Sequence, residues 1–222
     1  MAVREPLDHA EAREAIVDAG RRLAARGLVI GTSGNLSVRA GDEIVVTPTG
    51  VALDALDVGH LSVVTMTGNR VSGPPPTSEV PLHLAVYAAT GAGAIAHAHA
   101  VASTAVSCTC EGLPALHYNV MLLGGPPRTA RYATFGTDAL AVNVVEALVD
   151  GRTAALMQNH GSITYGADLG QACDRLELLE WLCELHLGAY RLGAPRVLTT
   201  DELEAVATAF GVSARRGRSA AG

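Results

Sequence analysis

The chain has 222 residues, a formal net charge of −6 and a hydrophobic content of 49%. The negative charge argues against nucleic acid as the main partner. The first ten residues carry charges and no apolar segment, and no apolar run is long enough to cross a bilayer. We therefore expect no secretory signal and no membrane partner, and the high hydrophobic content suggests buried subunit interfaces.

A chain of this length can form one sizeable core, and no long linker divides it. We expect one domain over residues 1–212, followed by a tail over 213–222. The tail holds Arg215, Arg216 and Arg218 among small residues. We interpret it as mobile and solvated, with an anion clamp as the alternative.

The predicted helices and short strands alternate along the chain without a repeat. In chain order they are a helix over 8–26, strands over 36–38, 43–46 and 61–66, a helix over 79–89, a strand over 94–99, helices over 102–110 and 137–149, strands over 153–158 and 162–165, and helices over 169–192 and 200–210. Gly27 ends the first helix, and Ser78 is expected to cap the helix that starts at Glu79. This pattern predicts an α/β fold in one domain.

All 16 basic residues are Arg, and the chain contains no Lys. Schiff-base chemistry with carbonyl substrates or with pyridoxal phosphate is therefore excluded, as is a P-loop lysine. Any chemistry that generates a carbanion here must use a metal ion as its electron sink.

Four side chains suited to metal binding stand at the ends of predicted elements. His97 and His99 lie two positions apart at the end of one predicted strand, so both rings can face the same point. His160 follows a second apolar run, and Glu79 opens a helix. A His-x-His pair alone is more often packing than a ligand pair, but three His and a carboxylate form a common zinc set.

The four cysteines fall in predicted helices and form no C-x-x-C pair. They are Cys108, Cys110, Cys173 and Cys183. We interpret them as buried free thiols in a reducing cytoplasm. Zinc ligation by Cys108 and Cys110 is a weaker alternative.

Three segments rich in Gly and small polar residues accompany the metal-capable side chains. They are residues 31–35, which end in Asn35, then Thr49-Gly50, then Thr77-Ser78. Backbone N–H groups in glycine turns, hydroxyl groups and a helix N-terminus can bind phosphate without Lys. Each segment alone is an ordinary turn more often than a phosphate site, so the argument depends on all three lying near the metal.

Six segments together resemble the class II aldolase/epimerase family, in particular its L-fuculose-1-phosphate aldolase branch. They are Gly31-Thr32-Ser33-Gly34-Asn35-Leu36-Ser37, Thr49-Gly50, Ser78-Glu79, His97-Ala98-His99, Tyr132-Ala133-Thr134-Phe135-Gly136 and Gln158-Asn159-His160-Gly161. The resemblance extends over roughly residues 8–210. It implies a cytoplasmic homotetramer with a single-domain α/β/α sandwich around a largely antiparallel sheet, and one Zn²⁺ per subunit at the subunit interface.

The resemblance also implies roles for individual residues. His97, His99 and His160 would hold the zinc, and Glu79 would ligate it at rest and act as the base when substrate displaces it. Tyr118 would reach into a neighbouring subunit's site. Phosphate would be bound by Asn35, Thr49, Gly50, Thr77 and Ser78. The implied reaction is cleavage of a ketose 1-phosphate, of the L-fuculose or 5-deoxypentulose type, to dihydroxyacetone phosphate and a short aldehyde.

Two departures from the family pattern are visible. Thr77 stands where the family's aldolases usually have Ser, and residues 211–213 lack a Tyr that these aldolases carry in the C-terminal tail. The second departure bears most on the identity of the substrate.

Other functions of the family remain open alternatives. A sugar-phosphate 4-epimerase would use the same site, but the family's epimerases place Asp where this chain has Glu79. A sugar-acid phosphate decarboxylase would also need a metal. A non-catalytic module like the adducin head would have lost the ligands, whereas all four are present here.

Overall fold

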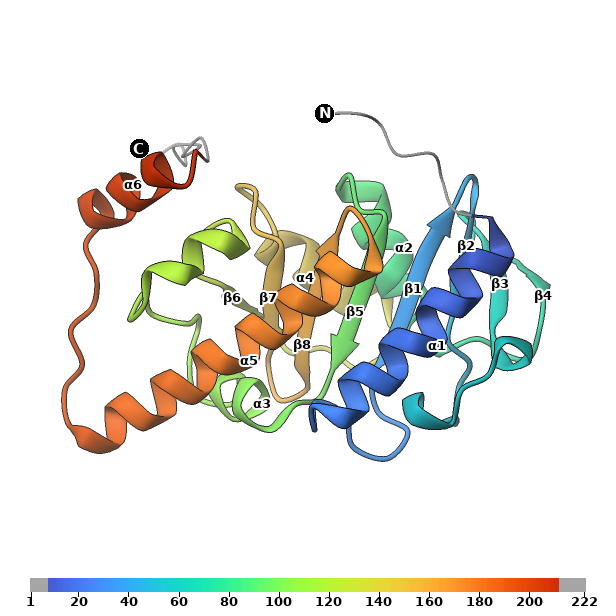
Figure 1. Ribbon diagram of the computed structural model, residues 1–222, viewed down its shortest axis with the longest axis horizontal. Helices are drawn as coiled ribbons and strands as arrows, with labels where there is room; N and C mark the ends of the chain where they lie inside the picture. The colour runs from blue at the N-terminus through green and yellow to red at the C-terminus, as the bar shows by residue number, and fades with distance from the viewer. Residues whose placement is uncertain (1–7, 212–222) are drawn as a thin grey trace.

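The computed structural model describes residues 8–211, and its core is one eight-stranded sheet in the order β4-β3-β2-β1-β5-β8-β7-β6 (Figure 1). The strands are β1 (Asn35–Ala40), β2 (Glu43–Val46), β3 (Ser62–Thr65), β4 (Arg70–Ser72), β5 (Ala94–Ala98), β6 (Arg128–Ala130), β7 (Ala154–Met157) and β8 (Gly161–Gly166). Only β6 and β7 pair in parallel, and the other neighbouring pairs are antiparallel. The expected largely antiparallel sheet is confirmed.

Helices cover both faces of this sheet, so the α/β/α sandwich is confirmed as well. Figure 1 shows α1 (His9–Ala25) and α5 (Leu169–Leu192) crossing one face, with α2 (Val80–Ala89) and α4 (Asp138–Ala147) behind the sheet. The short helix α3 (Val101–Ser107) packs against α5, and α6 (Thr200–Ala209) contacts the 3₁₀ helix η3 (Tyr118–Leu123). Two further 3₁₀ turns are η1 (Leu53–Ala55) and η2 (Val58–His60). None of the helices between residues 8 and 211 has the length and apolar character that a bilayer crossing requires.

The two faces of β1 and β5 have different partners because successive side chains on a strand point to opposite sides. Leu36 of β1 packs in the core beneath α1 and α5, whereas Ser37 points toward α2. On β5, Ala96 faces the same core as Leu36, while the next residue, His97, is on the opposite face of the sheet. The antiparallel register pairs Asn35 with His97, so both lie at the same end of the sheet.

Several local predictions were wrong. Ser78 does not cap α2, because Glu79 occupies the N-cap position with its carboxylate turned away from the helix. The helix predicted over 102–110 ends at Ser107, where Ser and Thr side chains bond the last helical carbonyls. Cys108 is consequently exposed and Cys110 half-buried, contrary to the expected burial of all four thiols.

The remaining cysteine predictions hold, since all four thiols are free and Cys173 and Cys183 are buried. Strands β4 and β6 were not predicted, because each has only three residues and neither has an alternating apolar pattern. The tail over 213–222 lies outside the described residues.

Candidate functional site

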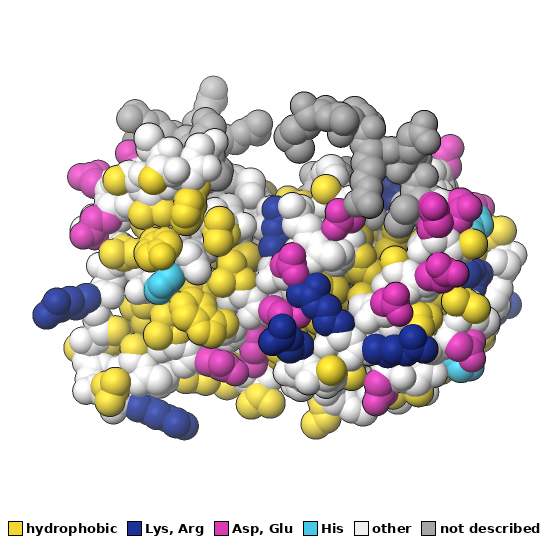
Figure 2. Space-filling model, viewed as in Figure 1, with side chains coloured by type: hydrophobic (Ala, Val, Ile, Leu, Met, Phe, Trp, Pro, Cys, Tyr) yellow, Lys and Arg dark blue, Asp and Glu magenta, His cyan; other side chains and the backbone are white. Residues whose placement is uncertain are grey.

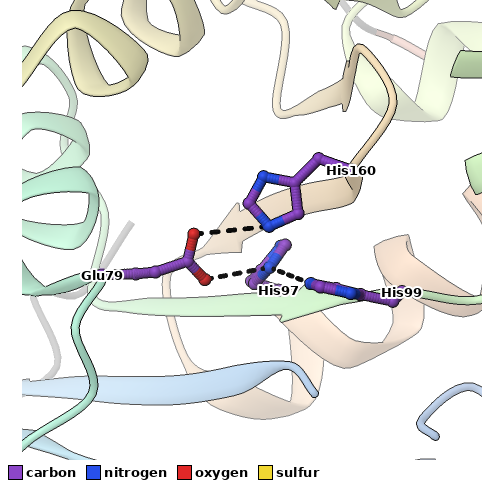
Figure 3. A group of neighbouring side chains, drawn as sticks. All are labelled: Glu79, His97, His99 and His160. Carbon is purple, nitrogen blue, oxygen red and sulfur yellow. Dashed lines mark hydrogen bonds and ion pairs between the residues drawn. The ribbon is translucent and has the colours of Figure 1, made fainter. Parts of the chain in front are cut away.

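The four metal-capable side chains converge at one end of the sheet (Figure 3). His97 lies on β5, His99 just beyond its end, His160 in the turn between β7 and β8, and Glu79 at the start of α2. One ligand atom from each lies within 4.8 Å of the others. Among residues 8–211 this is the sole such group of three or more His, Cys, Asp or Glu side chains, so Cys108 and Cys110 are not part of one.

The hydrogen bonding of His97 decides which of its nitrogens faces this cluster. Its Nδ1 lies 2.8 Å from the carbonyl oxygen of Ser162, which can only accept, so Nδ1 carries the proton. In the neutral ring, Nε2 then has no proton and carries a lone pair. Nε2 lies 3.0 Å from Nε2 of His99 and 3.1 Å from Oε2 of Glu79. Such a group of electron-rich atoms needs a proton or a metal cation among them.

The Glu79 carboxylate is buried, and its two oxygens have different surroundings. Oε2 accepts a 2.8 Å hydrogen bond from the Asn35 amide. Oε1 has no hydrogen-bond partner among the described residues and lies 3.5 Å from Nε2 of His160. A buried carboxylate oxygen without a donor is costly, and a bound cation would satisfy it.

The charges of these groups follow from burial and from each other. Burial raises the pKa of Glu79, but the charge and hydrogen bond of His97 and the Asn35 amide outweigh it, so this pKa lies well below its usual value. Burial lowers the pKa of His97, but the charge and hydrogen bond of Glu79 raise it overall. Burial and the neighbouring His97 lower the pKa values of His99 and His160 to about 4, so both rings are neutral at pH 7.

These residues fit a zinc ion. Ligand atoms about 2.0–2.1 Å from a tetrahedral ion lie roughly 3.3 Å apart, close to the separations of 3.0, 3.1 and 3.5 Å among the ring nitrogens and the carboxylate. Imidazole and carboxylate donors suit zinc and several other divalent ions. The donor set therefore supports a divalent metal, with His97, His99, His160 and Glu79 as its candidate ligands.

The backbone geometry of the turn that carries His160 favours particular residues on both sides of it. Asn159 has a φ of 54°, a left-handed conformation that Asn adopts more readily than most residues. A Cβ at Gly161 would lie 2.4 Å from the carbonyl oxygen of Ala98. Only Gly allows β8 to approach the end of β5 closely enough to bring His160 beside His99.

The metal-capable cluster opens into a cavity of about 480 Å³. The three predicted Gly- and hydroxyl-rich segments line it together. The lining residues from these segments are Thr32, Ser33, Gly34, Asn35, Thr49, Gly50, Thr77 and Ser78. Between residues 8 and 211 no Arg side chain lines this cavity, so the groups that this part of the chain offers to an anion there are neutral donors.

Five further lining residues were not predicted to belong to the site. They are Pro48, Tyr132, Ala133, Phe135 and Asn159. Both aromatic rings are mostly exposed, on a loop anchored by a 2.9 Å hydrogen bond from the Tyr132 N–H to Gln158. Residues 132–136 stand out in the sequence only as part of the family resemblance, because the fold and not the chain order brings them beside His160.

Tyr118 does not line the cavity. It begins η3 with 46% of its surface exposed, and its ring stacks on His117 at a centroid distance of 4.3 Å. Within one copy of the chain, Tyr118 is therefore not part of the wall of this cavity.

Comparison with known proteins agrees with this geometry. A 5-methylthioribulose-1-phosphate/5-deoxyribulose-1-phosphate aldolase of Rhodospirillum rubrum is 36% identical over 200 residues, which cover 89% of this chain and 90% of that protein. A 3-oxo-tetronate 4-phosphate decarboxylase of Haemophilus influenzae is 37% identical over 182 residues, covering 78% and 85%. A solved L-fuculose 1-phosphate aldolase matches with a TM-score of 0.87 and 34% identity over 93% of this chain and 99% of that one.

The family match extends over most of the chain. Residues 14–187 match the family described as Class II Aldolase and Adducin N-terminal domain. The fold, the four metal-capable side chains and this match agree with one another, and the chain belongs to the class II aldolase family.

Proposed function

We propose that this class II, metal-dependent lyase is a zinc aldolase. Its substrate would be a ketose 1-phosphate of the L-fuculose or 5-deoxypentulose type, cleaved to dihydroxyacetone phosphate and a short aldehyde. The observation that carries the proposal is the convergence of Glu79, His97, His99 and His160 beside a cavity lined by hydroxyl and glycine residues. The names of the related aldolases agree with this substrate class.

The chemistry requires stabilisation of the carbanion that C–C cleavage leaves. A divalent ion held by the three histidines would supply the positive charge for this step. Glu79 would deliver the proton to the carbon, with Oε1 as the reacting oxygen because Oε2 is held by Asn35. The substrate hydroxyl whose oxygen becomes that of the aldehyde gives up its proton in the same cleavage, so one proton leaves oxygen for the one gained at carbon. Tyr118 of a neighbouring copy is the candidate to relay it.

The phosphate would bind to neutral donors. Thr49, Gly50 and Ser78 line the cavity, and Gly50 has a φ of 74° with open space around it. Thr77 and Asn35 also line it, but each is already hydrogen-bonded within the protein, Asn35 to both Thr77 and Glu79. A phosphate group would therefore compete with these internal bonds at Asn35.

Tyr118 would act across a subunit boundary in a homotetramer. Figure 2 shows hydrophobic side chains gathered on the left half of the face that α5 crosses, with charged side chains at the edge of this area and scattered over the right half. The exposed aromatic residues include Tyr118, Trp181 and Phe210, with 46%, 43% and 41% of their surfaces exposed. Exposed apolar clusters of this kind are typical of protein interfaces.

A decarboxylase is the second candidate, because a relative with that name has a similar percentage identity, 37%, although over 182 residues compared with 200 for the aldolase of Rhodospirillum rubrum. Cleavage of a C–C bond next to a carbonyl leaves a carbanion in both reactions, and the same ion would serve both. A sugar-phosphate 4-epimerase is a weaker candidate, because the family's epimerases place Asp where this chain has Glu79. The complete ligand set argues against a purely structural module.

A product screen tests the proposal. The purified protein would be incubated with a panel of ketose 1-phosphates and of 3-oxo sugar-acid phosphates, with and without a chelator. We expect dihydroxyacetone phosphate from one of the ketose phosphates, loss of this product with chelator and recovery with zinc. Carbon dioxide from a 3-oxo acid without any aldol cleavage would select the decarboxylase, and full activity without metal would contradict both.

A further inference from the structure

A buried series of hydrogen bonds leads from Tyr87, near the C-terminal end of α2, to the Glu79 carboxylate. It runs from the Tyr87 hydroxyl to Ser37, from Ser37 to His83, from His83 to Asn35 and from Asn35 to Glu79. His83 is completely buried, and it touches neither the cavity nor the candidate metal ligands through these bonds. The reaction proposed above gives it no role.

The donor and the acceptor of each of these hydrogen bonds can be assigned by starting from the Glu79 carboxylate. The carboxylate only accepts, so the Asn35 side chain must present its nitrogen to Oε2, at 2.8 Å, and its oxygen to His83. His83 therefore carries its proton on Nε2, which lies 2.5 Å from that oxygen. Burial lowers the pKa of His83 to about 4, so the ring is neutral and Nδ1 is an acceptor.

The other half of the chain supports the same tautomer. Nδ1 of His83 lies 2.7 Å from Oγ of Ser37, whose hydroxyl donates to it. That oxygen can then accept from the Tyr87 hydroxyl at 2.9 Å. Burial raises the pKa of Tyr87 well above its usual value, so this phenol keeps its proton. Each of the four hydrogen bonds between Tyr87 and Glu79 is thus donated in the direction of Glu79.

We propose that His83 is a positioning residue that acts through Asn35 on Glu79. It holds the Asn35 amide with its nitrogen toward Oε2, which leaves Oε1 as the one oxygen free to ligate a metal or to carry a proton. If the amide were inverted, its oxygen would face the carboxylate and repel it. The inference rests on the proposed role of Glu79 as a metal ligand.

Two substitutions at His83 separate its two contacts. The amide nitrogen of Gln overlaps the position of Nε2 and can still donate to Asn35. The amide of Asn overlaps the position of Nδ1 and reaches Ser37 only. A third variant, Tyr87→Phe, is the control. It removes the hydroxyl group that is farthest from Glu79 in this series of hydrogen bonds, and it leaves the Ser37 hydroxyl to donate to His83.

The readout is binding of cobalt(II) to the metal-free protein, together with the visible absorption spectrum of the complex, neither of which needs a substrate. We expect His83→Asn to weaken binding by about 10–100-fold and to alter the spectrum, in the same sense as Glu79→Gln. His83→Gln and Tyr87→Phe should stay close to the parent protein. Circular dichroism would establish that all the variants are folded.

The possible outcomes separate a failure of the positioning role of His83 from a failure of the proposed role of Glu79 as a metal ligand. If Glu79→Gln alters cobalt binding but folded His83→Asn does not, or if His83→Asn and His83→Gln weaken it equally, His83 has no positioning role. If Glu79→Gln changes neither affinity nor spectrum, Glu79 is not a ligand, and both ideas are wrong. Should His83→Asn not fold, Ser37→Ala takes its place, since it removes the hydrogen bond to Nδ1 that supports the Nε2–H tautomer of His83, and unchanged cobalt binding there would contradict the positioning role.

Discussion

The carboxylate of Glu180 accepts a 2.8 Å hydrogen bond from the backbone N–H of Ser103, across 77 positions of sequence. Its other oxygen accepts a 2.7 Å bond from the N–H of Ala102. The N-cap of α3 is Ala100, which has no side chain able to cap, so a residue of α5 performs this function. Because His99 immediately precedes Ala100, the same contact fixes the segment that carries one candidate metal ligand.

Replacing Glu180 should destabilise the fold. In Glu180→Ala two buried N–H groups lose a charged acceptor, and we expect the free energy of unfolding to fall by roughly 2–4 kcal/mol in urea denaturation. Glu184→Ala is the matched control, because Glu184 is exposed on the same helix, and it should change stability by no more than about 0.5 kcal/mol. Equal effects of the two substitutions would show that the cap is unimportant.

Metal binding should release a proton from His97. Burial lowers the pKa of this ring, but Glu79 raises it overall, so the metal-free protein holds this proton to a higher pH than an ordinary histidine does, and a metal must displace it. Since the raised pKa means more protonation at lower pH, zinc affinity should increase as the pH rises from about 6 to 8. Calorimetry in two buffers of different ionisation enthalpy measures the released protons. An affinity independent of pH would contradict the expectation.

Removing the carboxylate charge of Glu79 should separate metal binding from catalysis. Glu79→Gln keeps the three histidines and should still bind zinc, although more weakly. It cannot move the proton, and we expect the rate of cleavage to fall by about 10²–10⁴-fold. The measurement is kcat with zinc at saturation, alongside the metal content of the variant. A near-normal rate would mean that another group is the base.

The phosphate interaction should affect substrate binding. Ser78→Ala and Asn35→Ala each remove a polar group from the cavity wall and should raise KM for a ketose 1-phosphate. Asn35→Ala should also lower kcat, because Asn35 holds Glu79, whereas Ser78→Ala should leave kcat nearly unchanged. The corresponding unphosphorylated ketose is the control substrate. If the parent enzyme uses it equally well, these segments are ordinary turns.

Sites shared between subunits should be restored by mixing two inactive variants. Tyr118→Phe should reduce cleavage strongly while zinc binding and oligomeric mass stay unchanged. Mixed with Glu79→Gln under conditions that allow subunits to exchange, it should recover activity, because some interfaces then combine an intact Glu79 with an intact Tyr118. Exchange that is demonstrated by mass spectrometry but restores nothing would exclude a shared site, as would an active monomer.

Much of the fold and site was predictable because the signals are local. The helices over α1, α4 and α5 were predicted within one or two residues of their ends, and the structure caps them with Asp8, Thr137 and Asp168. The metal-capable side chains were identifiable because each sits at the end of a predicted element. Strands β4 and β6 were missed because three residues carry too little pattern, and their pairing is decided by the neighbouring strand.

The sequence alone determined the kind of chemistry. A chain without Lys cannot stabilise a carbanion through a Schiff base, and its His and Glu residues are the groups that stabilisation by a metal needs. Only the tertiary structure decided how these groups are charged and oriented. His97 depends on the Ser162 carbonyl, Glu79 on Asn35, and α3 on Glu180. These partners lie between 44 and 78 positions away in sequence, so only the register of the sheet and the packing of the helices bring them within hydrogen-bonding distance.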